Sequence, residues 1–279
     1  MRAFHSKTVA LIDAARSALE RDAPMTVRQL FYRLVATQVI DNSDAQYNRV
    51  SRVLCEARKA GLVPWEWIED RLRRPRHVSM WYDPADFAAA VAASYRKNVW
   101  EQQETYLEVW LEKDALSAVF EDTLSRYGVT LNVGRGYDST TSVHDAAERW
   151  RDKGDVTVLH FGDFDPSGED MVRSLRERLA GFESCPEIVK VALTPEDIER
   201  HSLPPNPTKK QDRRSAKFVA RYGDRCVELD ALPPGVLKDR LRREIEARLD
   251  MDTMRDVWDA ERKECDRMVA ALERCEEVA

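Results

Sequence analysis

The chain has few of the features that cross-link a fold or anchor it in a membrane. Five cysteines are an odd number, and no two of them form a C-x-x-C pair, so neither a disulfide framework nor a thiolate zinc site is expected. The longest apolar stretch, residues 87–95, is about half the length that a bilayer-spanning helix needs. Asp13 and Arg16 interrupt the segment where a signal peptide requires an apolar core. These absences predict a reduced, cytoplasmic protein without a membrane partner.

Two further absences narrow the class of protein. The chain has no G-x-x-x-x-G-K-[ST] motif, so no P-loop for ATP is expected. With 10 glycines and 12 prolines among 279 residues, 43% hydrophobic and 34% charged, it resembles neither a disordered nor a fibrous chain. The length favours two globular domains.

The net charge of −6 is unevenly distributed along the chain. Residues 1–82 contain 14 Lys and Arg against 9 Asp and Glu, whereas residues 83–279 contain 30 against 41. A basic N-terminal part can bind phosphates while the acidic remainder holds a cation. The alternative is an ordinary solvated charged surface.

The first part of the chain shows three helical patterns. Apolar residues recur at helical spacing over residues 6–22, 26–39 and 44–60, and the second pattern begins with a capping box of Thr and Gln. The extended, Trp-rich segment VPWEWIEDRLRR follows at residues 63–74. Three short helices and such a segment predict a winged helix-turn-helix, a fold that commonly binds DNA. Arg49 and Arg52 of the third helix are the candidate phosphate contacts.

From residue 101 onward, strands alternate with helices, which predicts an α/β domain with a mostly parallel, Rossmann-like sheet. The domains are therefore placed at residues 1–100, 101–232 and 233–279, the last a pair of charged helices. The expected strands are 106–111, 129–133, 156–161, 188–193 and 226–229. The expected helices between them are 114–127, 142–152 and 168–179.

Three carboxylates follow two of these strands. Asp163 and Asp165 lie two residues apart in HFGDFDPSGED, and Glu112 ends an earlier strand. If those two strands are neighbours, the three side chains converge at one sheet edge as hard oxygen ligands suited to Mg²⁺. A surface turn at Asp-Pro-Ser-Gly is the plainer interpretation. An EF-hand is excluded because the twelfth position is Ser174 and no helix precedes the loop.

These motifs together resemble a known family. A strand-end Glu followed some fifty residues later by Asp-x-Asp-Pro-x-Gly is similar to the Toprim domain of topoisomerases and primases. TVRQLFY, residues 26–32, looks like the winged-helix motif of the topoisomerase VI A subunit and its meiotic double-strand-break relative. GRGYDSTTS, residues 134–142, resembles that family's Gly-Lys-Gly-x-Pro loop, with Arg135 and Asp138 in place of Lys and Pro. The domain order is the same, and the resemblance covers about residues 25–195.

The resemblance implies a fold, a reaction and partners. The chain would carry a winged helix, a Toprim domain and C-terminal helices, and would cleave duplex DNA by transesterification. Tyr32 would attack a phosphodiester and join the 5′ end, Arg28 would assist the phenol, and Glu112, Asp163 and Asp165 would bind Mg²⁺. A homodimer associated with the nucleoid is expected, with the Tyr of one protomer facing the metal of the other. The family's ATPase B subunit is not expected, because only about 25 residues precede the winged helix.

Two other functions remain open. A hydrolytic nuclease would keep the metal site, use water as nucleophile and leave Tyr32 structural. A DNA-binding regulator would use the second domain only for stability. The weaker candidates include basic residues for phosphate contact and a histidine on a helix surface. A second histidine adjoins the acidic loop, where it either supports the metal ligands or packs at the strand end. These weaker candidates are Arg135, Lys209, Lys210, Arg213, Arg214, His144 and His160.

Overall fold

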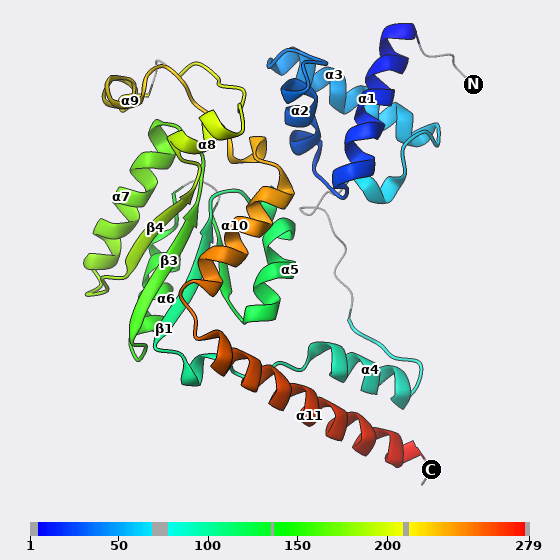
Figure 1. Ribbon diagram of the computed structural model, residues 1–279, viewed down its shortest axis with the longest axis vertical. Helices are drawn as coiled ribbons and strands as arrows, with labels where there is room; N and C mark the ends of the chain where they lie inside the picture. Colours follow the sequence, from blue (N-terminus) through cyan, green and yellow to red (C-terminus); the bar gives the residue numbers. More distant parts are fainter. Residues whose placement is uncertain (1–4, 69–77, 135–136, 209–211, 277–279) are drawn as a thin grey trace.

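The computed structural model describes residues 5–68, 78–134, 137–208 and 212–276, and they form an α/β fold. Three N-terminal helices lie beside a small parallel sheet that has helices on both faces, and a pair of helices extends away from the sheet (Figure 1). Within the described part of the chain, no helix is both long and apolar enough to span a bilayer.

The three expected N-terminal helices are present. They are α1 (Ser6–Asp22), α2 (Val27–Ala36) and α3 (Asp44–Lys59). The capping box at the start of α2 is confirmed, because Gln29 N donates to Thr26 Oγ1 at 3.2 Å and Thr26 N donates to Gln29 Oε1 at 2.8 Å. The segment expected to form the wing begins with the 3₁₀ helix η1 (Trp65–Trp67), and its residues 69–74 lie outside the described residues.

The sheet contains four parallel strands in the order β2-β1-β3-β4. They are β1 (Thr105–Leu111), β2 (Thr130–Val133), β3 (Asp155–Phe161) and β4 (Glu187–Ala192). The strands β1 and β3 run side by side with Leu111 opposite Phe161, so they end at the same edge. The strand neighbourhood on which the carboxylate prediction depends is therefore present.

The fifth expected strand, at residues 226–229, is wrong. Cys226 and Val227 form only isolated antiparallel bridges, to Asn206 and Phe164, and the chain then turns into the 3₁₀ helix η4 (Leu229–Ala231). Val227 and Leu229 are buried because they cover the carboxyl end of the sheet. Burial at the end of a sheet requires apolar residues just as a strand does, which explains the misleading pattern.

Alternating residues of the strands supply two separate cores. On one face, Leu107, Val109 and Leu111 belong to the large core, which includes α5 (Ser117–Tyr127) and α10 (Pro234–Glu246). On the other face, Trp110 packs against Trp150 beneath α6 (Thr140–Trp150) and α7 (Pro166–Ala180). This period of two is what a sheet covered on both faces requires.

Several helices were not expected from the sequence. α8 (Pro195–Arg200) follows β4, and α9 (Ser215–Tyr222) replaces the end of the predicted basic loop. Phe218 anchors α9 by packing against Phe164. The short helix η2 (Trp100–Gln102) was also not expected, whereas η3 (Asp114–Leu116) begins the helix expected at residues 114–127.

A helical pair formed by α4 (Pro84–Ser94) and α11 (Met251–Glu276) extends from the sheet (Figure 1). Tyr95 Oη and Lys97 Nζ, just after α4, donate to the Glu264 carboxylate at 2.5 and 2.7 Å. The N-terminal helices contact the rest of the fold elsewhere, where α2 packs against η4. There Arg33 Nη2 donates to the Ala231 carbonyl at 2.5 Å.

Candidate active site at the carboxyl end of the sheet

The predicted carboxylates Glu112 and Asp163 follow neighbouring strands and contact each other directly. Glu112 N donates to the Phe161 carbonyl at 2.9 Å, which continues the β1–β3 ladder by one residue. Asp163 N in turn donates to Glu112 Oε2 at 2.8 Å. The ladder therefore fixes the position of both side chains.

Asp165 is positioned by the start of α7. It is the N-cap residue of α7, and its Oδ1 accepts a hydrogen bond from Gly168 N at 2.7 Å. A Cβ atom at position 168 would collide with the backbone of Asp163, so the first turn of the helix can approach that strand end only with glycine. The Asp-x-Asp-Pro-x-Gly pattern thus has a structural reason.

Burial raises the pKa of the first two carboxyl groups. The pKa of Glu112 lies above its usual range, mainly because the group is buried and partly because Asp165 is near. Burial and the Glu112 carboxylate raise the pKa of Asp163 to about 7, although Lys113 opposes the shift. Such perturbed carboxyl groups are typical of functional sites.

Lys113 connects this cluster to the segment near residue 230. Its Nζ lies 3.1 Å from Asp163 Oδ1 and 2.9 Å from both Glu228 Oε2 and Asp230 Oδ2. Leu229 N also donates to Asp163 Oδ1 at 2.8 Å. The sequence did not predict a role for Lys113, Glu228 or Asp230. Only the position of Lys113, directly after Glu112 at the end of β1, could have indicated one.

Tyr32 lies on the other side of Glu228. Its side chain is buried, at 4% exposure, and packs edge-on against Phe31. Burial raises the pKa of its phenol, and Glu228 adds to the rise, whereas Lys113 and Arg28 lower it. The Tyr32 hydroxyl therefore shares its surroundings with the Lys113 cluster of the same chain.

Arg28 is near Tyr32, but its hydrogen bond goes to another residue. Its Nη1 donates to Glu228 Oε2 at 2.5 Å, and its guanidinium carbon lies 5.3 Å from the centroid of the Tyr47 ring. In the described part of the chain no hydrogen bond joins Arg28 to the phenol. Arg28 therefore acts on Tyr32 through its charge, which lowers the pKa of the phenol, and not through a hydrogen bond.

Two clefts meet at Glu228. The larger, of about 500 Å³, is lined by Arg28, Tyr32 and Tyr47 of the N-terminal helices. The smaller, of about 170 Å³, is lined by Asp163 and Asp165. Asn206, Pro207 and Glu228 line both. The tyrosine and two of the predicted metal ligands therefore face adjoining spaces within one chain.

The carboxylates have suitable chemistry for Mg²⁺ but do not form a finished site. Among the described residues, Glu112 Oε1, Asp163 Oδ2 and Asp165 Oδ2 accept no hydrogen bond, so one hard oxygen remains on each group. No group of three or more His, Cys, Asp or Glu side chains within those residues is close enough to hold a metal ion. The donors are therefore of the type that Mg²⁺ prefers, but the described side chains are not gathered into a metal site.

The predicted DNA contacts are only partly described. Arg52 is exposed on α3, and Arg49 is half-buried with its Nη2 3.4 Å from the Lys7 carbonyl. Arg213 is exposed, whereas Arg214 is bound to the carboxylates of Asp212 and Asp170. Three other basic candidates, Arg135, Lys209 and Lys210, lie outside the described residues. Arg52 and Arg213 thus remain the accessible candidates for phosphate contact.

The two histidines lie where they were expected. His144 is half-exposed on the surface of α6. His160 is buried in β3, where burial lowers the pKa of its imidazole to about 3, and its Nδ1 has no hydrogen-bond partner among the described residues. His160 therefore stays neutral and acts as a packed side chain.

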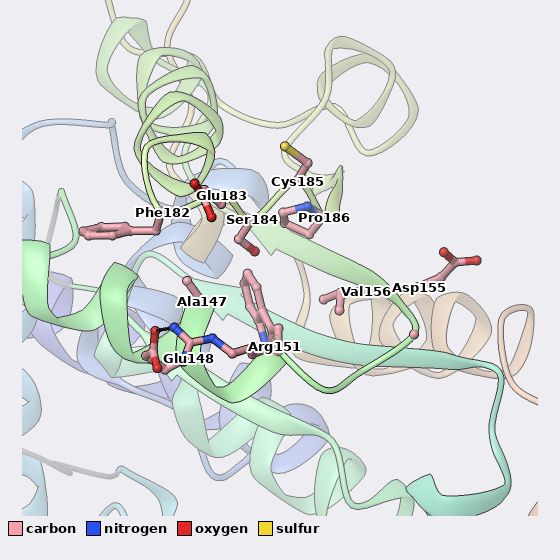
Figure 2. Close-up of a pocket in the computed structure, with 12 residues that line it drawn as sticks. Ala147, Glu148, Arg151, Asp155, Val156, Phe182, Glu183, Ser184, Cys185 and Pro186 are labelled. Atoms are coloured by element: carbon pink, nitrogen blue, oxygen red, sulfur yellow. Dashed lines mark hydrogen bonds and ion pairs between the residues drawn. The ribbon is translucent and has the colours of Figure 1, made fainter.

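A third groove, of about 340 Å³, lies at the opposite end of the sheet. Asp155 and Val156 at the start of β3 form one wall, and Phe182 and Cys185 after α7 form another (Figure 2). Arg151, which also lines the groove, forms an ion pair with Glu148 (Figure 2). The predicted catalytic residues are not among those that line it.

Comparisons with protein-family models and with curated proteins found no match for this chain. The resemblance to the topoisomerase VI A family therefore rests on the sequence motifs alone.

Proposed function

We propose that this protein cleaves duplex DNA by Mg²⁺-dependent tyrosine transesterification, with α1–α3 acting as a winged helix and the sheet as a Toprim domain. The observation that carries the proposal is the meeting of two clefts at Glu228, one lined by Tyr32 and the other by Asp163 and Asp165. A nucleophile and a set of metal-ligating carboxylates in adjoining clefts are the groups that this reaction needs.

In the reaction, the Tyr32 hydroxyl oxygen attacks the phosphorus of a phosphodiester. The bond between phosphorus and the phenolic oxygen forms, the bond to the 3′ oxygen breaks, and the 5′ end stays on the tyrosine. The phenol loses its proton to solvent, and the leaving 3′ oxygen gains one. Lys113 and Arg28 favour the phenolate, because both cations lower the pKa of Tyr32. Mg²⁺, when held by the three carboxylates, supplies positive charge to the transferring phosphoryl group.

One observation favours a second candidate, the hydrolytic nuclease. Tyr32 is almost completely buried, and the net effect of its surroundings is a pKa above the usual range. A buried, neutral tyrosine is a poor nucleophile. In that case, a water activated by Mg²⁺ would attack the phosphate and Tyr32 would only pack.

The substitution Tyr32→Phe separates the two candidates. The transesterase predicts complete loss of cleavage and of protein covalently bound to DNA on a denaturing gel, with duplex affinity nearly unchanged. Tyr47→Phe is the matched control, since Tyr47 lines the same cleft but is not the predicted nucleophile. Cleavage by Tyr32→Phe in Mg²⁺ would instead establish the nuclease.

The proposed homodimer would place two identical sites on the two DNA strands, since a two-fold axis suits the local dyads of a duplex. The resemblance implies sites shared between protomers, but here Tyr32 lies near Lys113 of its own chain. We therefore expect that mixing Tyr32→Phe with Glu112→Gln restores no nicking. Restored nicking in heterodimers confirmed by mass would show instead that two chains build each site.

A further inference from the structure

Glu228 links the two halves of the proposed site. Its Oε2 accepts hydrogen bonds from Arg28 Nη1 at 2.5 Å and from Lys113 Nζ at 2.9 Å. Arg28 belongs to α2 of the N-terminal helices, and Lys113 follows β1 of the sheet. One carboxylate oxygen thus lies between two cations that come from different parts of the fold.

The two cations depend on Glu228 to different degrees. Lys113 also contacts the carboxylates of Asp163 and Asp230, so it remains neutralised without Glu228. Arg28 pairs, among the described residues, with Glu228 alone. An arginine with a single carboxylate partner at the edge of a cleft can exchange that partner for another anion.

We propose that the Glu228 carboxylate occupies the place of a DNA backbone phosphate between Arg28 and Lys113, and that a phosphate must displace it before Tyr32 can react. The inference rests on the proposed function, because it assigns the anion that this site would take. Carboxylate and phosphate oxygens accept the same charge-assisted hydrogen bonds from arginine and lysine. The exchange therefore keeps both cations paired.

The geometry gives the displacement two consequences. Glu228 lines both clefts, so its departure would join the space beside Tyr32 to the space beside Asp163. Glu228 is also among the groups that raise the pKa of Tyr32, whereas Arg28 and Lys113 lower it. With Glu228 in place, the space beside Tyr32 therefore stays separate from the space beside Asp163, and the negative charge next to the phenol disfavours its ionisation.

The test compares Glu228→Gln with Glu264→Gln in binding to a mixed-sequence duplex at fixed salt without Mg²⁺. Each change removes one negative charge from a carboxylate that accepts hydrogen bonds from two side chains. Glu264 is the control, because it lies on α11, where it accepts from Tyr95 and Lys97. We expect about tenfold tighter binding for Glu228→Gln, since the phosphate no longer competes with an internal anion, and a change within about twofold for Glu264→Gln. Inorganic phosphate should compete with the duplex at correspondingly lower concentration in Glu228→Gln.

A second comparison removes one of the two cations. In the Arg28→Gln background, adding Glu228→Gln should give at most about a twofold gain in affinity, because the phosphate site has lost its arginine. If Glu228→Gln does not fold, Glu228→Asp keeps the charge but shortens the side chain, and it should also bind DNA more tightly than wild type.

Equal affinities of wild type, Glu228→Gln and Glu228→Asp would overturn the inference, as would a full gain in the Arg28→Gln background. Neither result depends on catalysis. Wild-type protein that forms the covalent DNA adduct while these affinities stay equal would retain the proposed function and lose only the inference. Tighter binding by Glu228→Gln without any adduct from wild type would refute the proposed function and retain the phosphate site between Arg28 and Lys113.

Discussion

Two glutamates, one within β1 and one just after it, have different surroundings. Glu108, in the middle of the strand, is fully buried, and Arg149 donates to both of its oxygens at 3.2 and 3.0 Å. Asn132 Nδ2 adds a third hydrogen bond at 2.6 Å. Glu112, just beyond the strand, accepts one hydrogen bond from the backbone of Asp163 and has another carboxylate, Asp165, nearby.

The difference separates a carboxylate that holds the fold from one that is free to act. Arg149, Asn132 and Tyr106 together supply the hydrogen bonds that the Glu108 carboxylate can accept, so it has no capacity left for a ligand. Burial and like charge raise the pKa of Glu112, so its charged form gains from any added cation. Glu108 is fully buried, whereas Glu112 is partly exposed. A second distinction is that Arg149 bonds Glu108 directly, whereas Lys113 and Lys190 act on Glu112 only through their charge.

The largest expected effect concerns activity and Glu112. Glu112→Gln should reduce Mg²⁺-dependent cleavage by at least about a hundredfold, because an amide supplies no charge to the metal. The free energy of unfolding should stay equal or rise, since the change removes a largely buried charge that forms no direct ion pair with a described residue. Cleavage gels and urea unfolding measure the two quantities. Unchanged Mg²⁺ binding by calorimetry in the variants Glu112→Gln, Asp163→Asn and Asp165→Asn would contradict the metal site.

The next largest effect is expected at Glu108, where substitution should lower stability and leave metal binding unchanged. Glu108→Gln should lower the free energy of unfolding by about 2–3 kcal/mol, because Arg149 and Asn132 lose a buried charged acceptor. Mg²⁺ affinity should remain that of the wild type. A double-mutant cycle with Arg149→Gln measures the coupling by urea unfolding, and it should reach about 1–2 kcal/mol. A loss of Mg²⁺ affinity in Glu108→Gln would erase the contrast between the two glutamates.

The sequence predicted Glu112, Asp163 and Asp165 because their placement follows from a local rule. Parallel strands end at a common edge, so residues just after β1 and β3 must be neighbours. Glu228 and Asp230 could not be predicted, because the segment that carries them was mistaken for a strand. Its buried residues cover the sheet end and only imitate a strand pattern.

The contacts between distant segments were equally invisible in the sequence. Arg28 and Glu228 are 200 positions apart, and nothing in either local pattern indicates their ion pair. The helix α9 was missed because it has only 8 residues, of which Phe218 is the only one that is buried. Periodicity predicts elements that bury a whole face. It does not predict those held by one anchor or by charge.

A smaller effect is expected from His160, which lies on β3 between the levels of the two glutamates. Burial and Lys190 lower its pKa to about 3, so the folded state keeps it neutral while the unfolded chain takes up a proton below about pH 6.5. Its contribution is therefore complete above pH 6.5 and is lost as the pH falls toward 3, by up to about 1.4 kcal/mol per unit. Urea unfolding at several pH values should show a shallower decline in His160→Gln. Identical slopes would show that His160 does not control this decline.

The smallest effect on the free energy of unfolding is expected for Arg151, which lies two residues after Arg149, the ion-pair partner of Glu108. Arg149 and Arg151, at the end of α6, each pair with a glutamate, but Glu108 is fully buried whereas Glu148 is 42% exposed. Arg151→Ala should therefore change the free energy of unfolding by less than about 0.5 kcal/mol, because water replaces an exposed ion pair at little cost. Arg149→Ala should cost several times more, since it leaves a buried carboxylate without its cation. The two variants remove the same side chain two positions apart, so helix propensity largely cancels between them. If urea unfolding gives equal losses, burial of the carboxylate is not what makes the Glu108 pair structural, and the contrast with Glu112 would need another cause.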